Sequence, residues 1–181
     1  SVQVAGGTGD VNTQQTQDTQ DTATQAADGQ FVIDGVAYVV SERYPESAIP
    51  AGFSRTRVTI DGYAYRELSN GSITLLYLKR ADNTAGDGVF YQYDEAMNTV
   101  TPFTMLGTAE QYVVLATPDS LLRDSFTETT LTVGDQTVSV YKEGDDSDFY
   151  FVYGTNQDGV TGWFQYDNTD GSIQRVNEDL L

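Results

Sequence analysis

Two aromatic pentapeptides constrain the fold more than any other feature of this sequence. Phe-Tyr-Gln-Tyr-Asp at 90–94 matches Trp-Phe-Gln-Tyr-Asp at 163–167, at an offset of 73 residues. Other segments repeat in the same order. AYVV at 37–40 is answered by QYVV at 111–114, and an irregular segment with proline follows each. Self-similarity at a fixed period marks a supersecondary unit that is used more than once. We therefore predict two tandem copies of one unit.

Turn signals indicate that each copy is antiparallel β structure. Asp-Gly pairs at 34–35 and 61–62 lie between runs rich in β-branched and aromatic residues. Asp-Gly tolerates the positive φ angles of a type I′ turn, the tight connection that matches the twist of two paired strands. We expect a two-residue hairpin at each of these sites.

Two apolar runs predict central strands. The segments 73–78 (ITLLYL) and 149–153 (FYFVY) are apolar on both alternating faces, which is typical of strands covered on both sides. Helix signals are few, the best being 117–125 (TPDSLLRDS) and 176–181. The predicted fold class is all-β with minor α: two tandem, duplicated antiparallel β-meander units packed as a sandwich or barrel-like module.

The first part of the chain differs from the rest in composition. Residues 1–29 contain no aromatic residue, Leu, Ile, Lys or Arg. Such a segment cannot bury enough apolar surface to offset the entropy lost on ordering its backbone. We predict a flexible polar linker over 1–29, a first β repeat over 30–105 and a second over 106–181.

Composition excludes several classes of function. The chain has 27 acidic and 9 basic residues, a net charge of −18, and no cysteine or histidine. This charge repels nucleic acids and anionic lipids, so we expect no nucleic-acid partner, and membrane attachment only through an anchor outside this sequence. Cysteine catalysis is excluded, the usual general base is missing, and no hydrolase, nucleotide or zinc-protease motif is present. We predict a non-enzymatic protein. The alternative is a glycan-processing enzyme with a carboxylate pair.

Aromatic side chains supply the candidate binding residues. In the matching pentapeptides, one alternating face of the strands carries Tyr91, Tyr93, Phe164 and Tyr166. The opposite face carries Phe90 and Trp163. An exposed face of this kind suits stacking on sugars or contact with a protein. The candidate ligand-binding residues are Tyr91, Tyr93, Trp163, Phe164 and Tyr166. The alternative is that the tyrosines cap the edge of the core with their hydroxyl groups in water.

Three acidic loops are candidate cation sites: 81–88, 143–148 and 166–171. Calcium accepts carboxylate and carbonyl oxygens in flexible loops, but Asp, Asn and Gly are also the ordinary residues of turns. The candidate metal ligands are Asp145, Asp146 and Asp148, and no cofactor other than Ca²⁺ at this site is expected.

The order Tyr-Val-Val, IPAGF at 49–53, a Leu/Tyr strand and GDGVFYQYD resembles an uncharacterised β-repeat domain of Gram-positive gut bacteria. The closing segment, DFYFVYGTNQDGVTGWFQYDNTDGSIQRV, is also similar, so the resemblance covers about 31–177. Those proteins are secreted or membrane-anchored. The resemblance therefore implies an extracytoplasmic domain beyond a membrane anchor, and it carries over no catalytic residue. Together with the polar first segment, the repeated β unit and the lack of catalytic motifs, it predicts a cell-surface domain of binding or structural type. Its expected partner is a carbohydrate or cell-wall ligand, or a protein.

Overall fold

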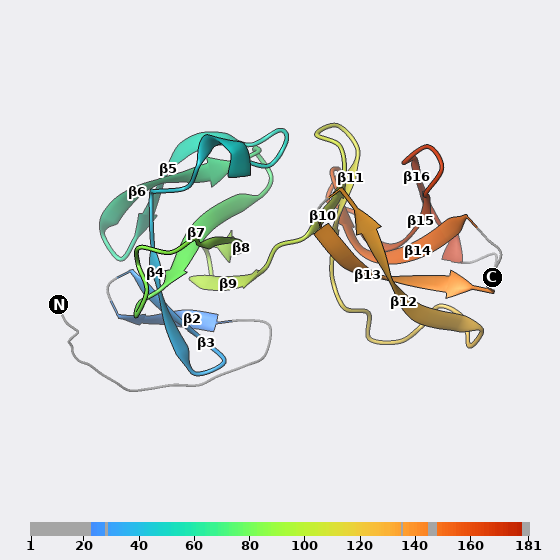
Figure 1. Ribbon diagram of the computed structural model, residues 1–181, viewed down its shortest axis with the longest axis horizontal. Coiled ribbons are helices and arrows are strands. Elements are labelled where there is room, and N and C mark those ends of the chain that lie inside the picture. The colour runs from blue at the N-terminus through green and yellow to red at the C-terminus, as the bar shows by residue number, and fades with distance from the viewer. Residues whose placement is uncertain (1–22, 28, 135, 145–147, 179–181) are drawn as a thin grey trace. The chain divides into compact units, whose positions relative to one another are not determined.

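The computed structural model describes residues 23–27, 29–134, 136–144 and 148–178. The chain divides into two compact units, Ser1–Phe103 (unit 1) and Thr104–Leu181 (unit 2). The described residues form two sheets of antiparallel strands, one of them a curled half-barrel (Figure 1). The all-β prediction is confirmed, and the division lies two residues before the predicted one.

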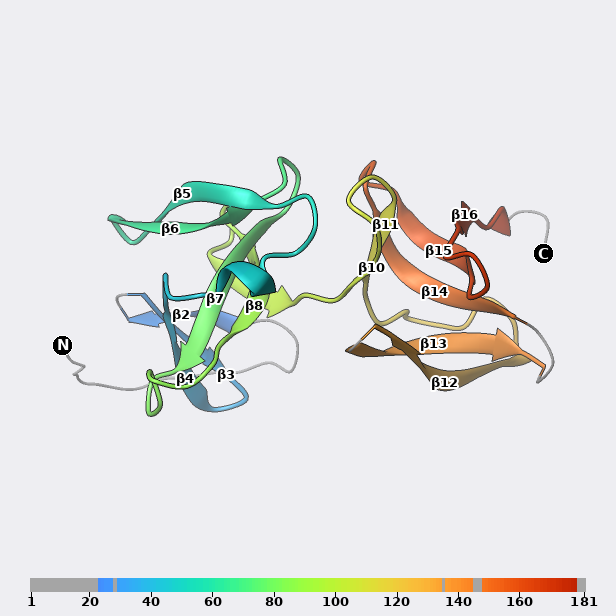
Figure 2. The same cartoon turned by 45° about the horizontal axis from the view of Figure 1, so that its top comes forward.

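Unit 1 closes most of its strands into a ring. Its strands are β2 (Ala23–Ala27), β3 (Gln30–Ile33), β4 (Val36–Val40), β5 (Ser54–Ile60), β6 (Tyr63–Ser69), β7 (Thr74–Arg80), β8 (Val89–Asp94) and β9 (Thr99–Pro102). The order β4-β3-β2-β9-β8-β7 is closed by pairing of β4 with β7. The β5–β6 hairpin continues the sheet from β7 outside this ring (Figure 2). A short 3₁₀ turn, Glu46–Ala48, lies between β4 and β5.

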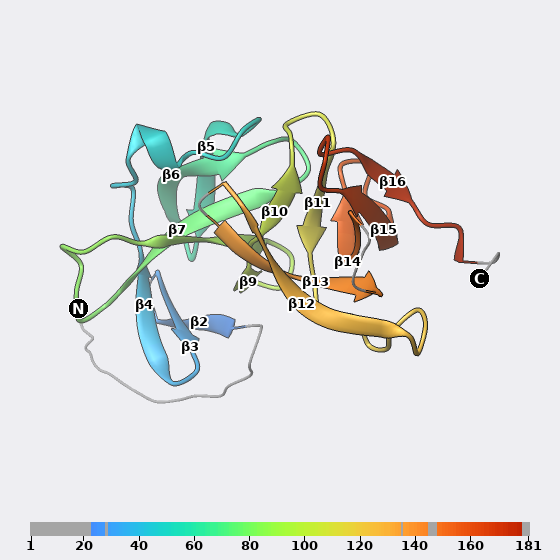
Figure 3. The ribbon, with the colours of Figure 1, turned by 45° about the vertical axis from the view of Figure 1, so that its right-hand side comes forward.

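Unit 2 repeats the strand pairing around the central strand. Its strands are β10 (Met105–Gly107), β11 (Tyr112–Leu115), β12 (Phe126–Val133), β13 (Gln136–Glu143), β14 (Phe149–Asn156), β15 (Thr161–Asp167) and β16 (Ile173–Arg175). The central strand β14 pairs with β11, β13 and β15, as β7 pairs with β4, β6 and β8 (Figure 3). The predicted duplication of one antiparallel unit is therefore present in the topology.

Strand registers make the two units comparable residue by residue. Gln92 of β8 faces Leu75 of β7, and Gln165 of β15 faces Phe151 of β14. Because the two glutamines correspond in the matching pentapeptides, Leu75 and Phe151 occupy equivalent positions on the two central strands. All further equivalences between the units follow by counting along paired strands.

One predicted match is out of register by one residue. Tyr38 faces Arg80 and Val113 faces Asn156, so Tyr38 is equivalent to Val113 and not to Tyr112. Tyr38 packs against the core of unit 1, and Val113 lies in the core of unit 2. A shift of one residue would turn every side chain of the strand to the opposite face of the sheet. The register is therefore set by which side chains are buried, and not by the matching Tyr-Val-Val sequences.

The two Asp-Gly hairpins are formed as predicted. Asp34 and Gly35 have φ angles of 51° and 80°, and Asp61 and Gly62 have φ angles of 52° and 85°. Positive φ at both central residues is the requirement of a type I′ turn. The turn at 61–62 places the β5 and β6 strands in direct register from its first flanking pair.

Each unit buries its own core. The core of unit 1 contains Phe31, Val58, Ile60, Leu76, Leu78, Tyr93 and Val100. The core of unit 2 contains Leu106, Val113, Leu131, Val138, Val140, Val152, Phe164, Tyr166 and Ile173. A second cluster on the outer face of unit 2 contains Phe126, Tyr141 and Trp163. The strand predicted over 73–78 forms as the central strand β7, and residues 75–79 of β7 are buried.

Strand β2 lies within the segment predicted to be a linker. It pairs with β3 on one side and with β9 on the other, so it completes the ring of unit 1. For these five residues the linker prediction is wrong. A strand between two neighbours is held through backbone hydrogen bonds, which need no apolar side-chain pattern. Residues 1–22 and 28 of the predicted linker lie outside the described residues.

The helix predicted over 117–125 is also wrong, because this segment is an irregular loop. Leu122 packs against the outer aromatic cluster of unit 2, whereas Leu121 is exposed. Two adjacent apolar residues do not form a helical face, and a nine-residue helix is marginal without one. The second predicted helix, 176–181, lies partly outside the described residues.

Candidate anion-binding site

The aromatic residues predicted as a binding platform lie inside the two units. Trp163 and Phe164 are 3% and 1% exposed, Tyr93 and Tyr166 are buried, and Tyr91 is partly buried. Burial raises the pKa of all three tyrosine hydroxyls. Both faces of the pentapeptide strands are covered, so these rings pack the cores and present no aromatic platform.

The environment of Trp163 explains why its face is not exposed. Its ring makes edge-to-face contacts with Phe126, Tyr141 and Tyr153, at centroid distances of 5.6, 5.3 and 5.6 Å. These partners come from β12, β13 and β14. Side chains from three other strands of the same sheet therefore cover the Trp163 ring.

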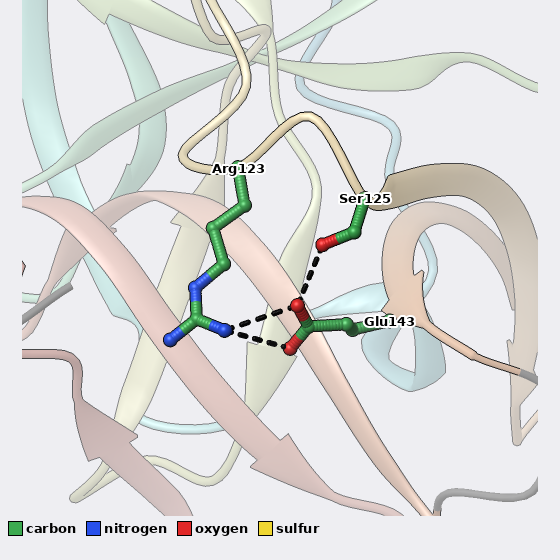
Figure 4. Close-up of polar contacts among 3 residues, drawn as sticks. All are labelled: Arg123, Ser125 and Glu143. Carbon is green, nitrogen blue, oxygen red and sulfur yellow. Dashed lines mark hydrogen bonds and ion pairs between the residues drawn. The ribbon is translucent and has the colours of Figure 1, made fainter.

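The predicted metal loop is described only in part. Asp145 and Asp146 lie outside the described residues, and Asp148 is exposed. At the start of this loop, Glu143 accepts hydrogen bonds from Ser125 Oγ (2.6 Å) and from Arg123 Nη1 (3.1 and 3.0 Å) (Figure 4). The Ser125 bond and then the Arg123 contact lower the pKa of Glu143. Among the described residues, no group of three or more acidic side chains could hold a metal ion.

Carboxylates in the other two acidic loops make local contacts. Asp82 accepts hydrogen bonds from Arg80 Nε and Nη2, at 3.0 and 2.9 Å. Asp167 Oδ1 accepts one from the Thr169 backbone N–H, and Asp170 Oδ1 accepts one from the Ser172 backbone N–H. The last two are the side-chain-to-backbone bonds by which Asp residues form turns.

The outer face of the β5–β6 hairpin contains a hollow lined by arginines. Its volume is about 520 Å³, and its lining residues are Glu42, Arg55, Thr56, Arg57, Ala64, Tyr65 and Arg66. Arg57 faces Arg66 across the strand pair, and Arg55 lies two residues before Arg57 on the same face. Three of the nine basic residues of the chain thus gather at one place, on a protein with a net charge of −18.

Arg55 is already engaged by its neighbours. Its Nη2 lies 2.7 Å from Glu46 Oε1, and its guanidinium lies 5.7 Å from the centroid of the Tyr44 ring. This hydrogen bond and charge contact lower the pKa of Glu46 and raise that of Arg55. Tyr44 in turn donates a hydrogen bond to the Arg66 carbonyl oxygen (3.0 Å), which joins the loop after β4 to the hairpin.

Arg57 and Arg66 differ from Arg55 in this respect. Within the part of the chain that the structure describes, neither guanidinium forms an ion pair. Both residues are exposed. Like charges directly opposite each other destabilise a sheet. A guanidinium presents N–H donors in a fork that fits carboxylate, phosphate or sulfate with two parallel hydrogen bonds. The pair is therefore a candidate anion-binding site.

Unit 2 shows that the fold does not require these arginines. Leu68 faces Leu75 in unit 1, and Tyr141 faces Phe151 in unit 2. Because Leu75 and Phe151 are equivalent, Leu68 of β6 is equivalent to Tyr141 of β13. Counting from this pair places Ser139 at the position of residue 66 and Thr130 at the position of residue 57, again facing each other. Glu128 takes the position of the third arginine. The same hairpin forms in unit 2 without a cation on this face.

The buried glutamate beside the hollow has a structural role. Glu67 is fully buried, and its Oε1 accepts a hydrogen bond from the Tyr77 backbone N–H at 2.6 Å. Oε2 has no hydrogen-bond partner among the described residues. Burial raises the pKa of Glu67 to about 8, and the nearby charge of Glu42 acts in the same direction, whereas the Tyr77 bond opposes both.

The place of Glu67 in the sheet explains its contact. Around Tyr77, β7 changes its neighbour from β6 to β4, so a backbone acceptor is missing there. The carboxyl group of Glu67 takes its place. The equivalent residue of unit 2 is Val140, which is fully buried.

Sequence reasoning missed the arginine hollow, although its signal was present. Arg55 and Arg57 alternate along a predicted strand, and the tight turn at 61–62 fixes the register of the hairpin. A register counted from that turn places residue 57 opposite residue 66. The two facing arginines could therefore have been deduced from the sequence.

Comparison of the chain with protein-family models, curated proteins and solved structures finds no match. Within the described ranges, no helix has the length and apolar character needed to cross a membrane.

Proposed function

We propose that this chain is a non-enzymatic binding module of the cell surface, and that it binds an anionic ligand through Arg57 and Arg66. The observation that carries the proposal is this pair of facing arginines, neither of them in an ion pair among the described residues, on a strongly acidic protein. The equivalent hairpin of unit 2 contains Thr130 and Ser139, so the architecture gives no reason for the two charges. A bound anion would remove the repulsion between them.

A titration with citrate, a small tricarboxylate, tests the site. At constant ionic strength, we expect the arginine Nε–Hε NMR signals of Arg57 and Arg66 to shift at the lowest citrate concentrations. The signals of Arg80 and Arg123 should respond later, because these side chains already have acidic partners. A common, weak response of all arginine signals would contradict a specific site.

Unit 2 supplies the matched substitutions. The double variant Arg57→Thr/Arg66→Ser introduces the residues of the equivalent positions, so we expect it to fold and to lose the citrate response. Arg80→Ser removes an exposed arginine from the same unit and should leave the response unchanged. Equal loss in both variants would indicate an effect of net charge alone.

The cell-surface location is the second part of the proposal. It is supported by the sequence resemblance to extracytoplasmic domains and by the polar composition of residues 1–22. We expect the full-length protein in the cell-wall, membrane or secreted fraction of the cells that express it. Recovery of the protein from the cytosol alone would contradict this location.

A further inference from the structure

The polar lining of the hollow narrows the class of anion. Glu42 lines the same hollow as the two arginines, and its Oε2 accepts a hydrogen bond from the Arg66 backbone N–H at 3.2 Å. Glu42 carries no hydrogen atom to donate when ionised, so a ligand group near it must be a donor. The ligand must therefore combine an acidic group for the guanidiniums with hydroxyl or similar donors for the carboxylate.

The hollow contains little apolar surface. Among its lining residues, Ala64 has the only aliphatic side chain, and the Tyr65 ring packs against the core of unit 1. Protein partners are generally anchored by aromatic and aliphatic side chains in desolvated pockets. The lining therefore favours a hydrophilic ligand over a protein segment.

The charge of the whole chain limits the charge density of the ligand. A net charge of −18 disfavours the approach of a dense polyanion. A ligand with widely spaced acidic groups experiences less of this repulsion while still contacting Arg57 and Arg66.

We infer that the ligand is an acidic saccharide, with a carboxylate bound by Arg57 and Arg66 and a hydroxyl group that donates to Glu42. This inference rests on the proposed anion site and specifies its ligand class. It assigns three residues on two segments: Glu42 after β4, and the facing arginines of β5 and β6.

Calorimetry on the full chain with four probes tests the ligand class. The probes are oligogalacturonate, a neutral malto-oligosaccharide of the same length, polyphosphate and a poly-glutamate peptide. We expect binding of oligogalacturonate and none of the neutral sugar. Arg57→Thr/Arg66→Ser should weaken oligogalacturonate binding about 10- to 100-fold, because charge-assisted hydrogen bonds are lost. Arg57→Lys/Arg66→Lys keeps both positive charges but removes the paired N–H donors of the guanidinium groups. This variant should weaken oligogalacturonate binding less than Arg57→Thr/Arg66→Ser does.

The effect of Glu42→Gln on binding should differ between an acidic saccharide and an anion without hydroxyl donors. Glutamine retains an acceptor for the Arg66 N–H but removes the charge, so oligogalacturonate should bind about 3- to 10-fold more weakly. Polyphosphate binding should strengthen in the same variant. An equal strengthening for both probes would overturn the saccharide assignment.

The other outcomes distinguish the inference from the proposed function. Arginine-dependent binding of polyphosphate or poly-glutamate without binding of oligogalacturonate would keep the anion site and reject the saccharide. Absence of arginine-dependent binding for every probe, citrate included, would reject both. Far-UV circular dichroism of each variant shows whether the strands are intact.

Discussion

Replacing Glu67 with glutamine should make the unfolding of unit 1 much less sensitive to pH between about 4.5 and 8. The folded state raises the pKa of Glu67 from its ordinary 4.5 to about 8, so between these values it holds a proton that the unfolded chain releases. The stabilisation is complete below about pH 4.5 and is lost as the pH rises to about 8. The difference corresponds to at most about 5 kcal/mol. Glutamine cannot ionise and still accepts the Tyr77 bond.

Urea unfolding near pH 5 and near pH 8.5 measures this effect. Trp163 is the only tryptophan of the chain and lies in unit 2, so its fluorescence follows unit 2, whereas far-UV circular dichroism follows both units. We expect Glu67→Gln to match the wild type near pH 5 and to be more stable near pH 8.5, in the unit 1 transition only. Glu110→Gln, an exposed change in unit 2, is the control. An unchanged pH dependence in Glu67→Gln would show that another group binds the proton.

A second substitution at this position separates charge from hydrogen bonding. Glu67→Val introduces the residue found at the equivalent position of unit 2, Val140. It removes the pH dependence as glutamine does, but it leaves the Tyr77 N–H without its acceptor. We therefore expect Glu67→Val to be less stable than Glu67→Gln by about 1–3 kcal/mol at any pH.

Replacing Gly154 with alanine should destabilise unit 2 by about 3 kcal/mol. A Cβ at this position would contact the Val114 carbonyl oxygen and would lie 2.9 Å from the Val114 carbonyl carbon. These atoms belong to the backbone of β11, so the steric clash with the new Cβ can be removed only if β11 moves away from β14. The Trp163 fluorescence transition should shift to lower urea concentration.

Gly162, which faces Gly154 across the β14–β15 pair, provides the control. A Cβ there would meet the Glu178 carboxylate at 3.0 Å and the Arg175 guanidinium at 3.4 Å. Both are the ends of flexible side chains on the surface, so we expect Gly162→Ala to change stability by less than about 1 kcal/mol. Equal losses in the two variants would indicate a general intolerance of side chains in these strands rather than a backbone clash.

The topology could be predicted because local signals and the repeat agree. The matching pentapeptides identify β8 and β15 as equivalent strands, and the Asp-Gly turns set hairpins whose register follows from turn geometry. The apolar run over 73–78 identifies the central strand of unit 1. The Asp-Gly turns and the apolar run are local in the sequence, and the pentapeptide match is found by comparing the sequence with itself. None of the three signals depends on tertiary contacts.

The remaining features depend on contacts between distant segments. The position of β2 is set by backbone pairing with β3 and β9, which leaves no side-chain pattern in the sequence. The burial of Trp163 depends on rings from Phe126, Tyr141 and Tyr153, so alternation along its own strand could not distinguish a core face from a binding face. The facing pair Arg57 and Arg66, in contrast, follows from the register of one hairpin, which the turn at 61–62 fixes.

The β5–β6 hairpin pairs with β7 only at its base, where residues 68 and 69 face residues 75 and 74, while Val58 and Ile60 on its inner face pack in the core of unit 1. Its counterpart β12–β13 is registered against β14 through a single facing pair, Tyr141 and Phe151. Side chains on the outer face of the β5–β6 hairpin point away from the core, so they can be replaced while the scaffold persists. Exchange of the two hairpins between the copies would show directly whether the outer face can be transferred from one unit to the other.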